Sequence, residues 1–421
     1  MRTLAGAVHE KYDDTGEDGG ANDSFIQVFI PKSGPHVGSK DSGKAHLPQR
    51  LTLDNLQISS AGDGKEIIEL CGHVSELDLT KNVITDWKEV FCILEHVPHL
   101  HFLNLTMNPL DDDTWDCGLQ KQFPNLKDIV LNSTGVSWSL VAKLLSCFPN
   151  LTELHVSLNK YKMVDFPAEF VHKSLIKLFV NKSEIENWTE ISKLGVAFPC
   201  LQTLNIIDNG ICELSPESEF QEFQALTDLN ISKCQIGSWE EVDKFGHFPA
   251  LINLRITDLP LVKDWEAKER RQHLVARLPS IKQLNGSTIT ETERDEAERA
   301  FLRYFMDSED RPARYAELEK IHGKLDPLAN VKFERAVYIN LLVKFEEKEE
   351  LMDIYVNQTP GDLKKLLRNF TGLPVAKMQV YYVEMFEGKI KDYVELKSLS
   401  RKLLSYNMNL GDEIHVHRKN C

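Results

Sequence analysis

Hydrophobic residues between positions 74 and 261 recur with one spacing, which is clearest at residues 74–84. There the apolar positions are Val74, Leu77, Leu79 and Ile84, and Asn82 occupies the polar position between the last two. The second apolar position advances by 24 to 26 residues at each step. Those second positions are Leu77, Leu103, Ile129, Leu154, Leu178, Leu204, Leu229 and Leu254. A period of this length predicts a solenoid in which each repeat packs on its neighbours.

The Leu-x-Leu segments at this period predict a leucine-rich-repeat solenoid over residues 51–290, an α/β fold with a short parallel strand in each repeat. Because successive strand residues point to opposite faces, the leucines face the core and the residues beside them face the concave surface. Asparagines at the ladder position, such as Asn82 and Asn108, are expected to bond to backbone groups of neighbouring turns. The candidate partner-binding residues on the concave surface are Glu76, Asp78, Asn104, Thr106, His155, Phe179, Asn205, Asn230 and Arg255. Phe179 is a candidate anchor because it is a large aromatic residue on a polar surface, although stacking on its neighbours explains it equally well.

Tryptophan marks the start of the helical half in alternate repeats, and Val or Ile follows three positions later. The four residues are Trp87, Trp138, Trp188 and Trp239. A stripe of tryptophans on the convex side is compatible with a binding face. Packing of the convex helices on the strand layer is the favoured interpretation.

Residues 1–50 are rich in Gly, Asp, Ser and Lys and hold one short apolar run, Phe25–Ile30. Such a composition buries too little apolar surface to offset the entropy lost on ordering. We therefore expect a flexible tail, and the alternative is that Phe25–Ile30 pairs with the first edge of the solenoid.

A helical cap with a linker is predicted over residues 291–333. Thr290 and Glu293 have the spacing of a capping box, which satisfies backbone donors at the start of a helix. The helix over about residues 291–305 is expected to cover the last repeat with one apolar face. That face comprises Ala297, Ala300, Phe301, Tyr304 and Phe305.

From residue 334 to 421 the apolar spacing becomes alternating, which predicts strands near residues 337–345, 352–356, 378–383 and 414–416. A helix capped by Thr359 lies between the second and third strands. Its expected buried stripe is Leu363, Leu366, Leu367 and Phe370. Hairpin, helix, strand, long connection and strand is the β-grasp order, and this part of the chain resembles ubiquitin-like domains.

Two features depart from ubiquitin itself. The chain ends at Arg418–Cys421 without a Gly-Gly tail, so we expect no conjugation to other proteins. Glu346, Glu347 and His417 lie where ubiquitin carries its hydrophobic receptor patch, which leaves Tyr381 as the candidate partner-binding residue on this surface.

The net charge is −15, from 64 acidic and 49 basic residues, which argues against binding nucleic acid or an anionic membrane. The N-terminus lacks the apolar run of a signal peptide, and the sequence has no apolar stretch of membrane-spanning length. The eight cysteines contain no Cys-x-x-Cys pair. Cys71, Cys147 and Cys200 lie in apolar sequence surroundings, so buried reduced thiols in a reducing compartment are expected.

Enzymatic activity is not expected. The sequence holds no nucleophile elbow, Walker loop or His-Glu-x-x-His motif. The pairs His99/His101 and His415/His417 have strand spacing that is compatible with metal binding, but ordinary strand-surface residues are the favoured interpretation. We therefore predict no cofactor, no metal and no catalytic residue.

Four segments carry a resemblance to the tubulin-specific chaperone E family: His73–Leu79, Trp188–Gly195, Arg277–Gly286 and Glu293–Arg299. The similarity extends over about residues 50–418. Members of this family also carry an N-terminal CAP-Gly domain, and the 50 residues before this solenoid are too few for that domain and lack its Gly-Lys-Asn-Asp-Gly signature. The resemblance therefore points to a shorter branch of the family.

That resemblance implies a tubulin-binding cofactor, monomeric and cytoplasmic, that associates with the cytoskeleton. Its expected partner is α-tubulin or the α/β-tubulin heterodimer, with heterodimer dissociation, tubulin turnover and microtubule destabilisation as the outcome. The alternative is a general repeat adaptor that links protein partners to the proteasome or to ubiquitin-pathway receptors without specificity for tubulin.

Overall fold

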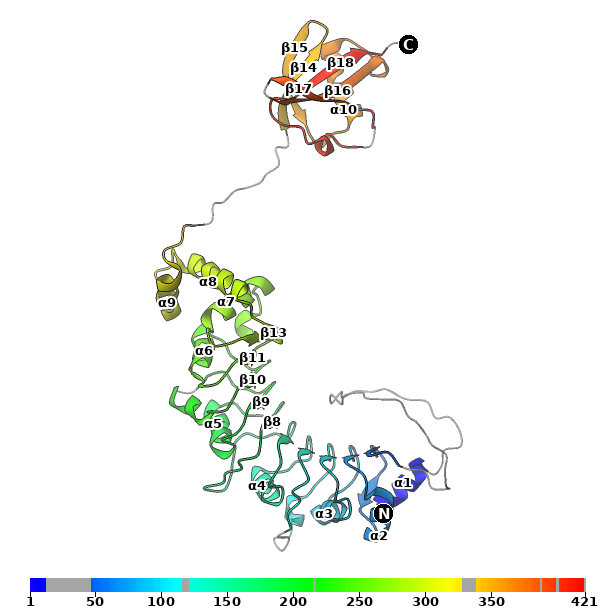
Figure 1. Cartoon of the computed structure of the whole chain (residues 1–421), viewed down its shortest axis with the longest axis vertical. Helices are drawn as coiled ribbons and strands as arrows, with labels where there is room; N and C mark the ends of the chain where they lie inside the picture. The colour runs from blue at the N-terminus through cyan, green and yellow to red at the C-terminus, as the bar shows by residue number, and fades with distance from the viewer. Residues whose placement is uncertain are drawn as a thin grey trace. The chain divides into compact units, whose positions relative to one another are not determined.

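A computed structural model of the chain describes residues 1–12, 47–115, 121–214, 217–327, 338–386, 388–398 and 401–419. The chain divides into two compact units, Met1–Pro327 and Leu328–Cys421 (Figure 1). The predicted strand Phe25–Ile30 and the end of the linker lie outside the described residues. Each unit has its own hydrophobic core and is considered by itself.

The first unit is the predicted leucine-rich-repeat solenoid. Among the described residues its strands form one sheet in the order β13-β12-β11-β10-β9-β8-β7-β6-β5-β4-β2, and the neighbouring pairs from β2 to β12 are parallel. Figure 1 shows these strands along one side of the unit and the helices along the other. The strands are β2 (Arg50–Thr52), β4 (Glu76–Asp78), β5 (Phe102–Asn104), β6 (Asp128–Val130), β7 (Glu153–His155), β8 (Lys177–Phe179), β9 (Thr203–Asn205), β10 (Asp228–Asn230), β11 (Asn253–Arg255), β12 (Gln283–Leu284) and β13 (Ser287–Thr288).

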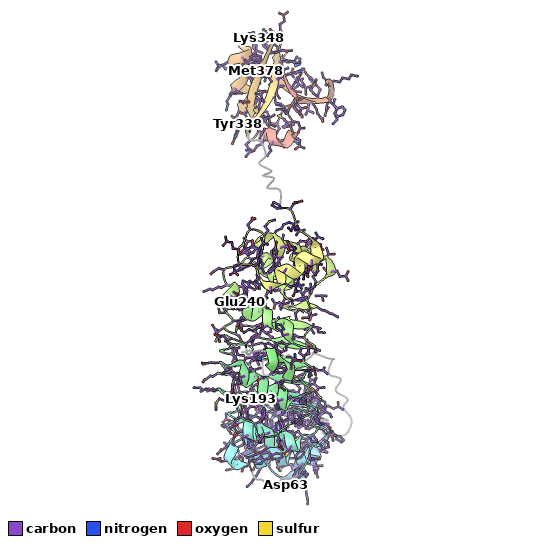
Figure 2. All side chains as sticks on the ribbon, turned by 90° about the vertical axis from the view of Figure 1, so that its left-hand side faces the viewer. Asp63, Lys193, Glu240, Tyr338, Lys348 and Met378 are labelled. Carbon is purple, nitrogen blue, oxygen red and sulfur yellow. The ribbon has the colours of Figure 1, made fainter. Side chains whose placement is uncertain are left out.

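The convex helices begin at the four tryptophans, and each is preceded by a side chain that caps its N-terminus. Asp86, for example, accepts a hydrogen bond from the backbone N–H of Lys88. Trp87, Trp138 and Trp188 are buried in the solenoid core, so the packing interpretation is confirmed for them. Figure 2 looks at the unit from the left-hand side of Figure 1 and labels Lys193 on α5 and Glu240 on α6. The helical segments are α3 (Trp87–His96), α4 (Trp138–Cys147), α5 (Trp188–Ala197) and α6 (Trp239–Asp243), with the 3-10 turns η1 (Asp112–Thr114), η2 (Glu217–Glu222), η3 (Lys244–His247) and η4 (Pro260–Val262).

Ladder asparagines bond to neighbouring turns as expected. Asn108 is fully buried, and its Nδ2 donates to the carbonyls of Leu79 (2.8 Å) and Leu105 (3.0 Å). Its Oδ1 accepts from the backbone N–H of Ile84 at 3.1 Å. Each such residue satisfies buried backbone groups that would otherwise be unpaired.

The expectation of a flexible tail is wrong for residues 1–12. Strand β1 (Arg2–Thr3) pairs with β3 (Ile58–Ser60), and helix α1 (Leu4–Tyr12) packs beside α2 (Gly64–Cys71). The side chains of Leu4, Ala5, Ala7 and Val8 are buried. These four apolar residues of one helix cover the open end of the first repeat. The prediction missed them because the composition of residues 1–50 as a whole is polar.

At the other end, α7 (Ala267–Arg277), α8 (Glu291–Phe305) and α9 (Ala313–His322) close the solenoid. Thr290 caps α8 as predicted, since its side chain accepts from the backbone N–H of Glu293. The predicted apolar face is partly wrong, because Tyr304 is 62% exposed whereas Leu302 is buried. The face is rotated from the predicted one because α8 packs on α9 as well as α7.

The second unit is a β-grasp fold. Among its described residues the sheet order is β15-β14-β18-β16-β17, with β14 parallel to β18 and the other pairs antiparallel. Its elements are β14 (Tyr338–Phe345), β15 (Lys348–Tyr355), α10 (Pro360–Thr371), η5 (Val375–Lys377), β16 (Met378–Phe386), β17 (Lys389–Glu395), η6 (Leu403–Tyr406) and β18 (Glu413–Arg418). Strand β17 lies within the segment that was expected to be only a long connection.

The helix of this unit is capped as predicted, with Thr359 at its start and Gly372 in the left-handed conformation (φ 71°) at its end. Leu363 and Leu367 are buried, but Leu366 is 49% exposed, so its place in the buried stripe is wrong. Residues at positions 363 and 367 lie one turn apart on one face, and 366 falls on the flank of that face.

Candidate functional site

The strand pairing arranges the concave residues of the solenoid in two rows. In β4, Glu76 and Asp78 flank the buried Leu77, and each is in register with the equivalent residue of the next strand. Neighbouring members of a row are therefore about 4.8 Å apart. The first row is Glu76, Phe102, Asp128, Glu153, Lys177, Thr203, Asp228 and Asn253, and the second is Asp78, Asn104, Val130, His155, Phe179, Asn205, Asn230 and Arg255.

A groove of about 810 Å³ covers the N-terminal half of these rows, from β2 to β8. Its apolar lining includes Phe102, Val130, Leu158 and Phe179. Its charged and histidine residues are Arg50, Glu76, Asp78, His101, Asp128, Glu153, His155, Lys177 and Lys182. An apolar floor with charged groups at its margins is typical of a protein-binding surface.

Two of the groove's carboxylates are neutralised by basic neighbours. Arg50 forms an ion pair with Glu76. Glu153 accepts hydrogen bonds from His155 Nε2 at 2.7 Å and from Lys177 Nζ at 2.9 Å. The bond from His155 has the largest effect on the pKa of Glu153, which is lowered from 4.5 to about 2. These groups form a fixed network along the groove.

Asp78 and Asp128 have no ion-pair partner among the described residues. Asp78 accepts hydrogen bonds from the backbone N–H and the hydroxyl of Thr80, at 2.9 and 2.6 Å. Asp128 accepts a hydrogen bond of 3.3 Å from the hydroxyl of Thr152. Burial, followed by the negative charge of Glu153, raises the pKa of Asp128.

The imidazole of His155 stacks on the phenyl ring of Phe179 in the middle of the concave surface. The ring centroids are 4.0 Å apart and the planes differ by 4°. Both side chains are half-buried, so the pair presents an aromatic surface to the groove. The stacking alternative for Phe179 is thus confirmed, and it leaves one part of the ring accessible.

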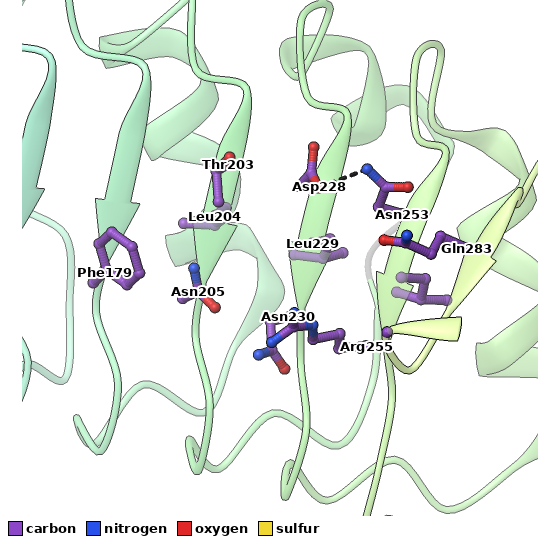
Figure 3. A pocket seen from close by; sticks show the side chains of 12 residues that line it. Phe179, Thr203, Leu204, Asn205, Asp228, Leu229, Asn230, Asn253, Arg255 and Gln283 are labelled. Atoms are coloured by element: carbon purple, nitrogen blue, oxygen red, sulfur yellow. Dashed lines mark hydrogen bonds between the residues drawn. The ribbon is translucent and has the colours of Figure 1, made fainter. Parts of the chain in front are cut away.

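A smaller pocket of about 220 Å³ lies beyond Phe179 on the C-terminal half of the surface (Figure 3). Its lining is rich in carboxamides, which include Asn205 and Asn253. Asn253 Nδ2 donates to Asp228 Oδ1 at 2.7 Å. Arg255 is exposed at its margin. This half of the surface is polar, whereas the groove is apolar with charged margins.

The structure places the predicted contact residues in two classes. Glu76, Asp78, His155, Phe179, Asn205 and Arg255 have accessible side chains on the concave surface. The prediction is wrong for Asn104, Thr106 and Asn230, which are at most 8% exposed. Asn104 Oδ1 accepts from both the backbone N–H and the hydroxyl of Thr106, and Asn230 Oδ1 accepts from the backbone N–H of Ser232. These residues stabilise the turn after the strand.

Sequence reasoning missed Phe102, Asp128, Glu153 and Lys177, all members of the first row. Each occupies the same repeat position as Glu76, immediately before the central apolar residue of the strand. Applying that position to every repeat would have found them from the sequence.

On the second unit, the predicted residue Tyr381 is half-buried on the exposed side of the sheet beside two aromatic neighbours. Its ring centroid is 4.8 Å from that of Tyr393 and 5.4 Å from that of His417. The hydroxyl of Tyr393 lies 2.6 Å from His417 Nε2 and 3.4 Å from His415 Nδ1. The pair His415/His417 thus belongs to an aromatic cluster on this sheet.

The described residues contain no group of three or more His, Cys, Asp or Glu side chains arranged to hold a metal ion. No helix among them is long and apolar enough to cross a lipid bilayer. Cys71 and Cys147 are buried free thiols, as expected, but Cys200 is exposed. Cys200 follows Pro199 at the turn between a convex helix and its next strand, where the chain returns to the surface.

Sequence comparison relates this chain to known proteins along most of its length. It is 39% identical over 418 residues to the human tubulin-specific chaperone cofactor E-like protein, covering 94% of this chain and 98% of that protein. It is 30% identical over 320 residues to tubulin-folding cofactor E of Arabidopsis thaliana, covering 70% of this chain and 59% of that protein. No family model matches the chain.

Among solved structures, the ubiquitin-like domain of mouse tubulin-specific chaperone e matches 22% of this chain and 96% of that domain, with 17% identity and a TM-score of 0.19. The fold assignment rests on the sheet topology of the two units. The family assignment rests on the sequence identity, which extends through the solenoid and the β-grasp unit alike. This chain belongs to the family of tubulin-specific chaperone cofactor E-like proteins.

Proposed function

We propose that this protein is a tubulin-binding cofactor that acts on α-tubulin. In this proposal it promotes dissociation of the α/β-tubulin heterodimer, and so tubulin turnover and microtubule destabilisation. It acts as a monomer in the cytoplasm, in association with the cytoskeleton. The observation that carries the proposal is the 39% identity to a tubulin-specific chaperone cofactor E-like protein across 94% of the chain.

The solenoid's concave surface is the proposed contact site. Its groove combines apolar surface at Phe102 and Phe179 with charged groups, which is the composition of a specific protein interface. Arg255 and Asn205 extend the polar part of the same surface. The Tyr381 cluster on the β-grasp unit supplies a second contact.

To dissociate the heterodimer, the cofactor must bind one state of tubulin more tightly than the other. A ligand shifts an equilibrium only by the difference between its affinities for the two states. The proposed cofactor therefore binds separated α-tubulin more tightly than it binds the heterodimer, through surface that becomes accessible on separation. Two contact sites on one chain favour this outcome, because engagement of the second site is intramolecular once the first is bound.

The test is dissociation of purified α/β-tubulin, measured by analytical ultracentrifugation with two labelled subunits. The full chain is compared with a truncation that ends at Pro327, which retains the complete first unit and its core. We expect the full chain to dissociate the heterodimer and the truncation to be weaker. Binding without dissociation would leave a tubulin-binding protein of another kind, and no binding would contradict the proposal.

Binding measurements separate this function from that of a general adaptor of the ubiquitin–proteasome system. An adaptor of that kind would bind proteasome or ubiquitin-receptor subunits through the β-grasp unit and show no preference for tubulin. Parallel binding measurements with those subunits and with tubulin distinguish the two.

A further inference from the structure

We propose that the groove between β2 and β8 binds an extended basic segment of the partner protein, with a lysine or arginine side chain seated against Asp128. This inference rests on the proposed function only for the identity of the partner. The chemistry of the segment follows from the groove itself. Asp128 was not among the residues that the sequence singled out.

The first argument is the charge balance of the groove. Glu76 is neutralised by Arg50, and Glu153 by Lys177 with a hydrogen bond from His155. Within the described residues this leaves the carboxylates of Asp78 and Asp128 without an ion pair, and the more distant charges of Lys177 and His101 act on Asp128 only at longer range. Both face the same groove, from β4 and from β6.

The second argument is that the charge of Asp128 forms no ion pair among the described residues. The side chain is half-buried, beside the like charge of Glu153, and accepts a single hydrogen bond from Thr152. A neutral amide would accept that bond equally well. Burial and the negative charge of Glu153 disfavour the ionised form of Asp128 in the free protein. A cationic ligand beside Asp128 would favour that ionised form.

The third argument is the apolar surface around Asp128. Phe102, which is half-buried, is its neighbour on one side in the same row. The stacked rings of His155 and Phe179 continue this surface toward β8. Lysine and arginine have long aliphatic stems that pack on such surfaces while the charged end reaches a carboxylate, and arginine also stacks on aromatic rings.

The fourth argument is geometry. Six strands at about 4.8 Å spacing give the groove a length of about 24 Å, which is the length of about seven residues of an extended chain. Lys182, exposed after β8, has no ion-pair partner among the described residues. The groove thus offers negative groups over β4 to β6 and a positive group beyond β8. That polarity fixes the direction of a bound segment.

The experiment measures binding of fluorescent peptides of about seven residues to the full chain by polarisation. One peptide contains arginines within an apolar sequence, and its matched partners carry citrulline or glutamate in their place. We expect the arginine peptide to bind at least about tenfold more tightly than the citrulline peptide, and the glutamate peptide to bind least. Asp128→Lys should abolish this preference, and Asp128→Asn should reduce it.

Two variants complete the design. Phe179→Ala should weaken all three peptides without changing the salt dependence of the arginine peptide, because it removes apolar surface and no charge. Glu296→Lys, an equal change of charge on the exposed face of α8, should have no effect. Melting curves of every variant establish that the chain is folded. Equal binding of the arginine and citrulline peptides, or an unchanged preference in Asp128→Lys, overturns the inference.

Binding of α/β-tubulin to the same variants separates the two proposals. If tubulin binds and Asp128→Lys leaves that binding intact, the groove inference fails while the proposed function stands. If the arginine peptide binds through Asp128 but tubulin does not bind, the proposed function fails and the basic segment belongs to another protein.

Discussion

The imidazole of His155 lies parallel to the ring of Phe179, with 4.0 Å between the ring centroids. The two residues come from adjacent repeats, β7 and β8, and they are in register in the pairing of those strands. A polar network at Glu153 holds His155 from one side, so the pair is a fixed aromatic surface in the centre of the concave face. The pair lies where the groove meets the carboxamide pocket, because Phe179 lines both.

Removing this surface should weaken tubulin binding. The double variant Asp78→Lys with Phe179→Ala is expected to bind tubulin at least about tenfold more weakly, because central aromatic anchors dominate interface energies. Its melting temperature should stay within about 2 °C of the parent, because both side chains are partly exposed. The matched control is Glu296→Lys with Val196→Ala, which makes the same kinds of change on helices α8 and α5. Unchanged tubulin binding in the double variant would move the contact away from the concave face.

The Glu153 network predicts a pH dependence of stability. The folded-state pKa of Glu153 is lowered from 4.5 to about 2. A depressed carboxyl pKa contributes stability above the unfolded-state value, and that contribution is lost as pH falls through the folded-state value. The free energy of unfolding should therefore exceed that of Glu153→Gln by about 1 kcal/mol above pH 5, given partial exposure to solvent. Urea denaturation at several pH values should show this difference shrinking toward pH 2, and a constant difference would contradict the assignment.

Loss of a ladder asparagine should be far more costly than loss of an exposed one. Asn108→Ala removes three hydrogen bonds to buried backbone groups, so we expect a loss of about 3 kcal/mol in the free energy of unfolding. Asn125→Ala removes a single bond to the carbonyl of Pro98 at the surface and should cost at most about 0.5 kcal/mol. Chemical denaturation of both variants measures the contrast. Similar costs would mean that the ladder is dispensable.

Arg277 should be essential for docking the helical cap. Its side chain is 3% exposed, lies over the ring of Trp239 with 4.8 Å from Cζ to the centroid, and donates to Asp243 at 2.7 Å. Arg277→Ala is expected to cost about 3 kcal/mol, because a partly buried carboxylate loses its partner. The exposed pair between Arg299 and Asp295 provides the control, since Arg299→Ala should leave the free energy of unfolding nearly unchanged. Limited proteolysis of α8 reports cap release, and equal protection in both variants would contradict this role.

The N-terminal helix should behave as part of the folded solenoid. Leu4 is fully buried, so Leu4→Ala is expected to reduce the free energy of unfolding by about 2 to 3 kcal/mol. Glu10→Gln, on the exposed side of the same helix, removes only a surface ion pair with Arg2 and should change it by less than about 1 kcal/mol. A Leu4→Ala protein with unchanged stability would return residues 1–12 to the flexible tail that their neighbours' composition suggests.

Much of the fold was predictable because its signals are periodic. The repeat of Leu77 and its equivalents, the capping role of Thr290 and the hairpin–helix–strand order of the β-grasp unit each follow from spacing within the chain. The prediction failed at positions where two packing partners compete. Tyr304 has helical spacing for the core, yet the joint packing of α8 on α7 and α9 turns it toward solvent. The short helix α1 carries too few apolar residues to stand out from the polar composition that follows.

For the concave surface, too, some features were predictable from the sequence and others were not. By itself, the sequence determined which residues form the solenoid frame and which repeat positions face outward, because both depend on a local period of two along each strand. Only the tertiary structure decided what those outward residues do. Neighbours in a row are about 25 residues apart in the chain, so the stacking of His155 on Phe179, the neutralisation of Glu153 and the unpaired charge of Asp128 exist only once the repeats are in register. Asn104 and Asn230 occupy outward-facing positions in the strand pattern, but their side chains turn inward. Each amide oxygen accepts a hydrogen bond from a backbone N–H of the following turn, so the buried polar groups are paired.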